Sequence, residues 1–477
     1  MNRIQRQRIV DGSLLALALA SAVAVVVTRR WQSSRPSDEV TGALIPVLAE
    51  AEPSELVFAR GGKSVRVVRR DPAAETASWI VESPWKRAAE SSTVDGVTTA
   101  LRDMQLVRKI QAGPKLSSDE LARFGLQQPS FSWQVQVANT TWTVAFGADA
   151  PQPRGGTYVD VVAPNSSTHQ LYVAAVDIAK LALTPEQLAE PRLVPYVPSD
   201  FGTVSIESDS HRTNFRFDSA RFRWFQAEDQ HYRISRTEMD TFLLQLTTLK
   251  ALRFLTPAEA AAKHWAKNGA SVTLGLPKAQ ATVRLEFGGP CSDEPNAFLV
   301  SISGPEQFEA CADTRAVSAR LDVPASDWVD SRLFSIRPDE LESLEEKYGG
   351  RTLKLERWES GFRVSEREVH PLDLETGNRL LGALLKIGGK FAQPSSIGTS
   401  FDDTSIVRVR SAVIGDTDQY EERVTLGPAL ASGDRYVRRE ADGAILKVPA
   451  NAVPSLLIDE TRLKQAPPSR ELDAGAE

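Results

Sequence analysis

One pattern constrains the fold of this chain more than any other: the same short elements recur about every 140 residues. In each copy a strand meets a glycine, a loop follows, and an aromatic residue begins the next strand. The glycines are Gly147, Gly288 and Gly427. The aromatic residues are Tyr158, Phe298 and Tyr436. Because independent features keep one period, the sequence predicts three copies of one structural unit.

Three further features keep the same period. Each copy contains an aromatic strand, then a helical segment, and finally a closing motif in which an arginine precedes a leucine. The aromatic strands are residues 78–82, 222–226 and 361–366, and the helical segments begin at Val94, Glu238 and Leu374. The arginines of the closing motif are Arg192, Arg332 and Arg462.

These features divide the chain into residues 53–197 (repeat 1), 198–336 (repeat 2) and 337–463 (repeat 3). Within a copy we expect three strands, a helix and then four strands. Short loops and period-two alternation favour an antiparallel sheet with helices packed on one face, which is an α+β class. Residues 31–52 are predicted to form a linker and residues 464–477 a disordered tail.

The N-terminus carries a signal for cellular location. Arginines flank the apolar segment Ser13–Val27. About sixteen apolar or small residues form a helix of roughly 24 Å, and flanking arginines can snorkel to extend its reach. We expect residues 1–30 to be a basic cytoplasmic stub and a transmembrane signal anchor in a bacterial inner membrane, with the remaining chain in the periplasm. The alternative is a cleaved signal peptide, because Ala20-Ser21-Ala22 offers a cleavage site.

The charge balance argues against a nucleic-acid partner. The chain has 56 Lys and Arg residues against 62 Asp and Glu residues, a net charge of −6, and no concentrated basic face is evident. The only cysteines, Cys291 and Cys311, flank a predicted hairpin. In an oxidising compartment we expect them to form a disulfide. No Cys/His cluster is present, so no metal site is predicted.

The recurring glycines have a structural interpretation. We expect each to end a strand, where the chain turns through φ values that a Cβ would resist. The following aromatic residue is expected to face the core or a neighbouring strand. The loops between them differ in length and content, which is not expected of a shared catalytic or phosphate-binding loop.

No motif for catalysis stands out. The sequence has no GxxxxGK[ST], GxGxxG, HExxH or GxSxG pattern. The five histidines have no partner histidine at helical spacing and no counterpart in another copy. We therefore predict no catalytic residue and no cofactor. The acidic segment Gly415–Glu422 lacks the calcium-loop pattern, and we interpret it as a solvated turn.

The tryptophans of repeat 1 leave a second function open. Trp85, Trp133 and Trp142 could form a sugar-binding platform if they were exposed together. Trp79 has aromatic counterparts in the other copies, which favours a place in the core.

Repeat 1 resembles a known family in several motifs. These are the stretch from Trp79 to Pro84, the sequence FGLQQP at Phe124–Pro129, and the strands VAFG, TYV and LYV that follow. The pattern is similar to the bacterial domain-of-unknown-function 4340 family, in which a membrane helix precedes repeated copies of such a unit. Proteins of this kind often occur beside auxiliary components of gliding-motility-type ABC transporters. The resemblance therefore implies an accessory role in an envelope assembly and supplies no catalytic residues.

Together these observations predict a non-enzymatic, membrane-anchored envelope protein whose partners are the membrane and envelope or ABC-transporter subunits. Two alternatives stay open. One is a peptidoglycan- or glycan-binding module, and the other is an enzyme of an unrecognised type.

Overall fold

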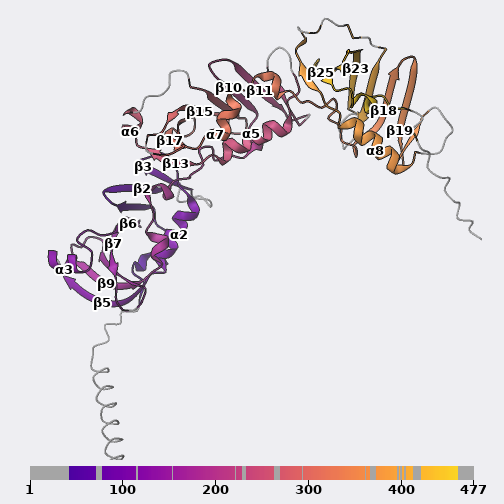
Figure 1. The fold of residues 1–477 in the computed structure, drawn as a ribbon. Helices are drawn as coiled ribbons and strands as arrows, with labels where there is room; N and C mark the ends of the chain where they lie inside the picture. The colour runs from indigo at the N-terminus through magenta and orange to yellow at the C-terminus, as the bar shows by residue number, and fades with distance from the viewer. Residues whose placement is uncertain are drawn as a thin grey trace, which may run out of the picture. The chain divides into compact units, whose positions relative to one another are not determined.

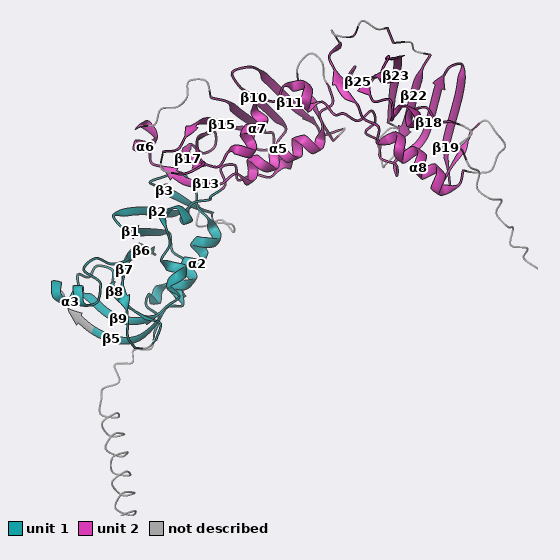
Figure 2. Cartoon of the chain, viewed as in Figure 1, with its two compact units in different colours: residues 1–191 teal, residues 192–477 magenta. Residues whose placement is uncertain are grey.

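Three antiparallel sheets dominate the part of the chain that the structure describes (Figure 1). The structure is a computed structural model. It describes residues 42–70, 78–113, 117–152, 154–220, 222–227, 232–262, 269–292, 294–359, 361–365, 372–394, 397, 400–401, 404–411, 420–459 and 463. The chain divides into two compact units, residues 1–191 and 192–477 (Figure 2). The first unit contains one sheet and the second contains two.

The sheet of the first unit has nine strands in the order β4-β3-β2-β1-β6-β7-β8-β9-β5. The strands are β1 (Glu55–Arg60), β2 (Lys63–Arg70), β3 (Ser78–Ser83), β4 (Arg87–Ala88), β5 (Gln105–Gly113), β6 (Phe131–Val137), β7 (Thr140–Asp149), β8 (Gly156–Val162) and β9 (His169–Ala175).

Each sheet of the second unit has eight strands, in the orders β12-β11-β10-β14-β15-β16-β17-β13 and β20-β19-β18-β22-β23-β24-β25-β21. We call them sheet 2 and sheet 3. Sheet 2 contains β10 (Thr203–Glu207), β11 (Arg212–Asp218), β12 (Arg223–Gln226), β13 (Ala251–Leu255), β14 (Ser271–Leu276), β15 (Ala281–Pro290), β16 (Phe298–Ser303) and β17 (Phe308–Ala312). Sheet 3 contains β18 (Leu341–Tyr348), β19 (Arg351–Trp358), β20 (Gly361–Val364), β21 (Lys390–Ala392), β22 (Ile406–Ser411), β23 (Glu421–Ala429), β24 (Arg435–Arg439) and β25 (Ile445–Val448).

Helices are few and mostly short. The α-helices are α2 (Ser91–Arg102), α3 (Ser118–Arg123), α4 (Ile178–Leu181), α5 (Arg236–Thr248), α6 (Pro257–Ala262), α7 (Arg315–Leu321), α8 (Leu374–Leu385) and α9 (Val453–Leu456). Four 3₁₀ helices also occur in the described residues: η1 (Pro46–Ala49), η2 (Pro185–Leu188), η3 (Pro198–Asp200) and η4 (Ala325–Trp328).

All three sheets share one connectivity. Three consecutive strands form a meander, a long helix follows (α2, α5 or α8), and one strand crosses to the far edge of the sheet. Four further strands then fill the space between that edge strand and the meander. The additional strand β4 extends only the first sheet.

The strand at the far edge corrects the predicted order of elements. We expected four strands directly after the helix, but β5, β13 and β21 come first and pair with the last strand of their sheet. Two of the predicted helical segments, residues 94–107 and 238–252, extended into β5 and β13, whereas the third, residues 374–387, ended before β21. β13 and β21 are too short to show a clear alternation, and the pairing of β5 contains two register shifts that interrupt it.

Two of the three long helices, α5 and α8, begin at a side-chain cap, whereas α2 has none. Ser235 accepts a hydrogen bond from the amide of Glu238 at the start of α5, and Asp373 accepts one from Thr376 at the start of α8. The inward faces are apolar. In α2 they include Val94, Val97 and Leu101, which are fully buried.

The expected membrane anchor at residues 1–30, residues 31–41 of the expected linker and the tail from residue 464 lie outside the described residues. The linker prediction is wrong for residues 42–52, because they include η1 and the buried side chains of Leu44, Ile45 and Leu48. Within the described part of the chain, no helix is both long enough and apolar enough to span a membrane.

Candidate functional site

Charged side chains gather in the interior of the second unit, where a protein core is ordinarily apolar. They come from β12 and the segment that precedes α5, from the segment that follows η4, and from β23, β24 and the turn after β24. We call this group the ionic cluster. Its members are Arg223, Arg233, Asp330, Ser335, Tyr420, Glu422, Arg439 and Asp442.

Glu422 lies at the centre of the ionic cluster, and its side chain is only 4% exposed. Its Oε1 atom lies 3.1 Å from Nη1 of Arg223 and 3.0 Å from Nη1 of Arg233. The backbone N–H of Ser335 donates to Oε2 at 2.6 Å, and the Ser335 hydroxyl donates to Oε1 at 2.5 Å. Both oxygens of the buried carboxylate are therefore satisfied.

Arg233 connects this carboxylate to a second one. Its Nε lies 3.1 Å from Oδ2 of Asp330, and its Nη2 donates to the carbonyl of Arg332 at 2.6 Å. The backbone N–H of Arg233 donates to Oδ2 of Asp442 at 2.8 Å. One residue of repeat 2 thus contacts two acidic residues of repeat 3, Glu422 and Asp442.

Arg439 makes the reciprocal connection from repeat 3. It pairs with Asp442 at 2.7 Å, and both side chains are 3% exposed. Its Nη1 donates to the carbonyls of Asp330 at 2.7 Å and Arg332 at 2.9 Å. The ionic cluster therefore joins sheet 2 to sheet 3 through contacts donated from both sides.

The charges of the ionic cluster compensate one another. Burial alone would raise the pKa of Glu422 and of Asp330, but the nearby guanidinium of Arg233 and further arginine contacts hold both pKa values below their usual range. Burial raises the pKa of the Tyr420 hydroxyl. The three arginines of the cluster face three carboxylates, so no charge is left unbalanced. Buried ion pairs add little net stability, and in some proteins their role is to fix one arrangement of the parts that they join.

The ionic cluster encloses little space. A cavity of about 20 Å³ lies among Arg223, Arg233, Tyr420, Arg439 and Asp442. That volume is enough for one water molecule and not for a substrate. The geometry therefore suits a structural junction between two sheets, and it leaves no room for chemistry on a bound molecule.

Comparison of the repeats reveals the signal that sequence reasoning missed. We call residues at equivalent register positions of the three sheets a row. Glu422 lies in the same row as Trp142 of the first sheet and Val283 of sheet 2. In the same way Arg439 occupies the row of Val161 and Ile302. Charged residues thus replace apolar ones at two interior positions of repeat 3 alone. The predicted solvated turn at Gly415–Glu422 is wrong for Glu422, because its side chain is buried, and residues 415–419 lie outside the described residues.

The three recurring glycines share one place in the fold. Each directly follows the residue after which the strand pairing shifts: Phe146 in β7, Phe287 in β15 and Leu426 in β23. Gly147, Gly288 and Gly427 therefore lie at equivalent β-bulges. The predicted reason for glycine was wrong, because none of the three has a positive φ. At Gly147 the reason is close approach, since a Cβ there would lie 2.2 Å from the carbonyl oxygen of Phe124.

The aromatic residues after the loop are equivalent in only two sheets. Val159, Val300 and Val437 oppose the residues before the glycines. Tyr158 and Tyr436 therefore occupy one row, whereas Phe298 lies one residue earlier and faces the other side of its sheet. The loop of repeat 2 differs in length, and alignment by aromatic character concealed this shift.

The closing arginines lie in connecting segments. Arg192 forms an isolated bridge with Lys250, and Arg332 forms one with Gly388. In both segments the following leucine donates its amide to the residue next to the bridge: Leu193 to Leu249, and Leu333 to Ile387. Arg462 lies outside the described residues.

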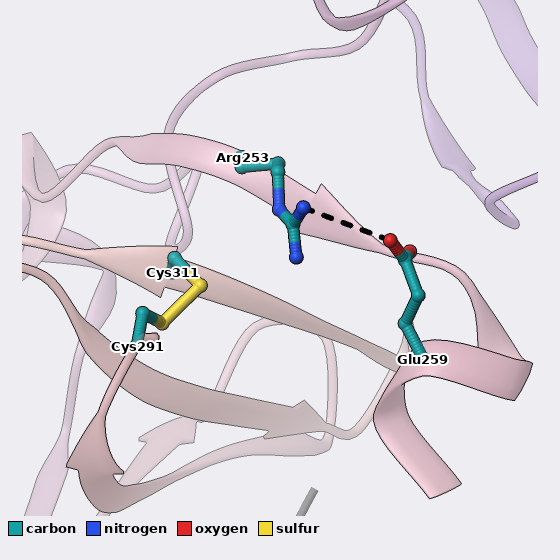
Figure 3. The surroundings of a disulfide bond; sticks show 4 residues. All are labelled: Arg253, Glu259, Cys291 and Cys311. Atoms are coloured by element: carbon teal, nitrogen blue, oxygen red, sulfur yellow. Dashed lines mark ion pairs between the residues drawn. A yellow bond between two sulfur atoms is a disulfide. The ribbon is translucent and has the colours of Figure 1, made fainter. Parts of the chain in front are cut away.

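Cys291 and Cys311 are joined by a disulfide with a Cα–Cα distance of 6.1 Å (Figure 3). Cys311 belongs to β17, and Cys291 directly follows β15. Both lie in a small apolar cluster under α6. Beside them, Arg253 of β13 pairs with Glu259 of α6 at 3.7 Å (Figure 3).

The tryptophans of repeat 1 do not form an exposed platform. Trp133 is fully buried and donates its indole N–H to the carbonyl of Leu181 at 3.1 Å. Trp85 is also buried, and Trp142 is partly buried. Trp79 lies in the core, as its counterparts in the other repeats indicated.

Two histidines in the described residues have polar partners. In the first unit, Nδ1 of His169 lies 2.6 Å from Oδ2 of Asp160. In the second unit, Nδ1 of His211 lies 2.8 Å from the hydroxyl of Ser210 within one turn. Neither arrangement combines a nucleophile, a base and an orienting acid. No group of three or more potential metal ligands occurs among the described residues.

Residues 79–269 match the family model described as Domain of unknown function (DUF4340). The match begins in β3 and ends before β14. It confirms the resemblance that the motifs of repeat 1 indicated. No curated protein and no solved structure matches the chain significantly.

Proposed function

We propose that this chain acts by binding, as a membrane-anchored accessory or scaffold subunit of an envelope assembly of the ABC-transporter-like or gliding type. The observation that carries the proposal is the ionic cluster. It commits buried charges to holding two repeats in one arrangement, which is what a protein that presents fixed surfaces requires. The basic and apolar N-terminal segment supplies the inner-membrane anchor, and the other residues lie in the periplasm.

The larger surface depression in the second unit also favours binding over catalysis. An open groove of about 670 Å³ runs beside β10 and the turn between β14 and β15. Among the described residues its lining contains Phe201, Phe217, Leu276, Pro277, Gln280 and small or hydroxyl-bearing residues, without an acidic, basic or histidine side chain. Such a lining supplies no general acid or base.

The disulfide agrees with a periplasmic location, because disulfides persist in oxidising compartments. A glycan platform receives no support from Trp85 and Trp133, because both rings are buried. An aromatic ring must be exposed to stack on a sugar.

The experiment that tests the proposal is purification of the tagged full chain from gently solubilised membranes. We expect envelope or transporter subunits to be recovered in fixed stoichiometry with the chain. The proposal is wrong if the chain is recovered alone and carries a saturable hydrolytic activity that one side-chain substitution abolishes.

A further inference from the structure

The edge strands β12 and β20 hold the same place in sheets 2 and 3, so they present equivalent edges. The edge of sheet 2 is covered. Arg223, the first residue of β12, stacks its guanidinium 4.5 Å from the ring centroid of Tyr420 and pairs with Glu422. An aromatic ring and a carboxylate from the following repeat thus occupy this edge.

The equivalent edge of sheet 3 exposes apolar surface. Trp358 is 42% exposed and Leu374 is 46% exposed, and these are the only large apolar side chains with such exposure among the described residues of repeat 3. They are neighbours. Trp358 pairs across the hairpin with Gly361, and Cδ1 of Leu374 lies 3.9 Å from the position that a Cβ on Gly361 would occupy.

A cation lies on the same edge. The guanidinium of Arg363 in β20 stacks 4.1 Å from the ring centroid of Trp358. Its ion pair with Glu356 is long, at 3.8 Å, and the Arg363 side chain is 40% exposed. Among the described residues this is the one ion pair of Arg363, and a partly exposed guanidinium stacked on a ring can bind a carboxylate from another molecule.

We propose that Trp358, Arg363 and Leu374 form a docking surface for a segment of a partner protein that carries a carboxylate next to an aromatic or aliphatic side chain. This inference rests on the proposed binding function and specifies the chemistry of one contact. The chain itself contains an example of such a contact: at the equivalent edge of sheet 2, the ring of Tyr420 and the carboxylate of Glu422 contact Arg223.

The segment that contains Tyr420 and Glu422 cannot fill this surface from a second copy of the chain. The carboxylate of Glu422 is already buried in its own molecule. The corresponding rows of the other two sheets offer Trp142 and Val283, which carry no charge. We assign the partner segment to a different protein, and self-association through this surface would contradict that assignment.

A peptide with the sequence of residues 418–426 tests the proposal, because it presents Tyr420 and Glu422 in a free chain. The peptide is labelled and titrated into the purified full chain, and fluorescence anisotropy is recorded. We expect saturable binding that weakens by about tenfold or more for Trp358→Ala, as for an interface hot spot. A peptide with both glutamates changed to glutamine, E421Q and E422Q, should also bind more weakly.

Leu252→Ala is the matched control, because Leu252 is 53% exposed on β13 and lies outside the docking surface. Binding should be unchanged in this variant. The inference fails if the peptide does not bind saturably, or if wild-type and Trp358→Ala chains bind it equally. It also fails if sedimentation shows self-association that Trp358→Ala abolishes, since the occupant would then be a second copy. These outcomes leave the proposed function intact if envelope subunits still co-purify with the chain.

Discussion

Replacing Glu422 by glutamine tests whether the ionic cluster holds repeats 2 and 3 together. The substitution keeps the size of the side chain and removes its charge. Arg223 and Arg233, which lie 3.1 and 3.0 Å from Glu422, then lose their shared counter-charge in a site almost closed to water. Breaking a buried ion pair by removing one partner costs about 3–5 kcal/mol.

Amide hydrogen exchange measures the loss of stability where repeats 2 and 3 meet, which we call the junction. Leu333 donates its amide to the carbonyl of Ile387, and Gly389 donates to that of Ser331, so both bonds connect the two repeats. Opening of the junction exposes both amides to exchange. A loss of about 3–5 kcal/mol accelerates exchange through this opening by roughly two hundredfold to several thousandfold.

Glu421→Gln is the matched control, because it makes the same chemical change one residue away. Glu421 is 39% exposed and pairs with Arg408 and Arg410 at the surface. Surface pairs contribute about 0–1 kcal/mol, so exchange at Leu333 and Gly389 should change by less than about fivefold. Equal acceleration in both variants, or none in Glu422→Gln, would refute the assigned role of the ionic cluster.

Three further predictions follow from the structure. Burial would raise the pKa of Glu422, but Arg233 and Arg223 lower it, so the ionised carboxylate stabilises the folded state fully above the usual carboxylate pKa and loses this effect as the pH falls through the lowered folded value. Exchange protection at the junction should therefore persist down to about pH 5 and disappear on further acidification. Replacing Cys291 and Cys311 together by serine opens a loop with a sequence separation of 20 and should destabilise repeat 2 by about 3 kcal/mol in denaturant unfolding, whereas an unchanged midpoint would contradict a stabilising disulfide. Gly147→Ala should lower the thermal midpoint of the first unit because its Cβ would meet the Phe124 carbonyl, while Gly96→Ala in α2, where a Cβ meets nothing within 4 Å, should leave it unchanged or raise it.

The period of about 140 residues was the most informative feature of the sequence, because three sheets of one connectivity follow the same interval. It could not reveal the edge strands. β21 has only three residues, and the residues of β13 read as a continuation of the helical pattern of α5. A short edge strand is defined mainly by its pairing partner, and the pattern of a single chain does not contain that information.

The ionic cluster was hidden for a different reason. Arg223, Arg233 and Asp330 lie about 100 to 200 residues from Glu422 in sequence, and each alone resembles an ordinary surface charge. Their burial depends on how sheet 2 meets sheet 3. Row-by-row comparison of the repeats exposes the unusual charges at Glu422 and Arg439, but it requires the strand register that the structure supplies.

Partner recovery with and without an intact ionic cluster tests most directly whether the chain binds envelope subunits through repeats that this cluster holds in place. Wild-type, Glu422→Gln and Glu421→Gln chains are purified from gently solubilised membranes, and co-purifying envelope subunits are quantified by mass spectrometry relative to the chain. We expect fixed stoichiometry for the wild type and Glu421→Gln, and a marked loss of partner subunits for Glu422→Gln at equal chain level. Undiminished partner recovery with Glu422→Gln, or a wild-type chain that is recovered alone, would contradict it.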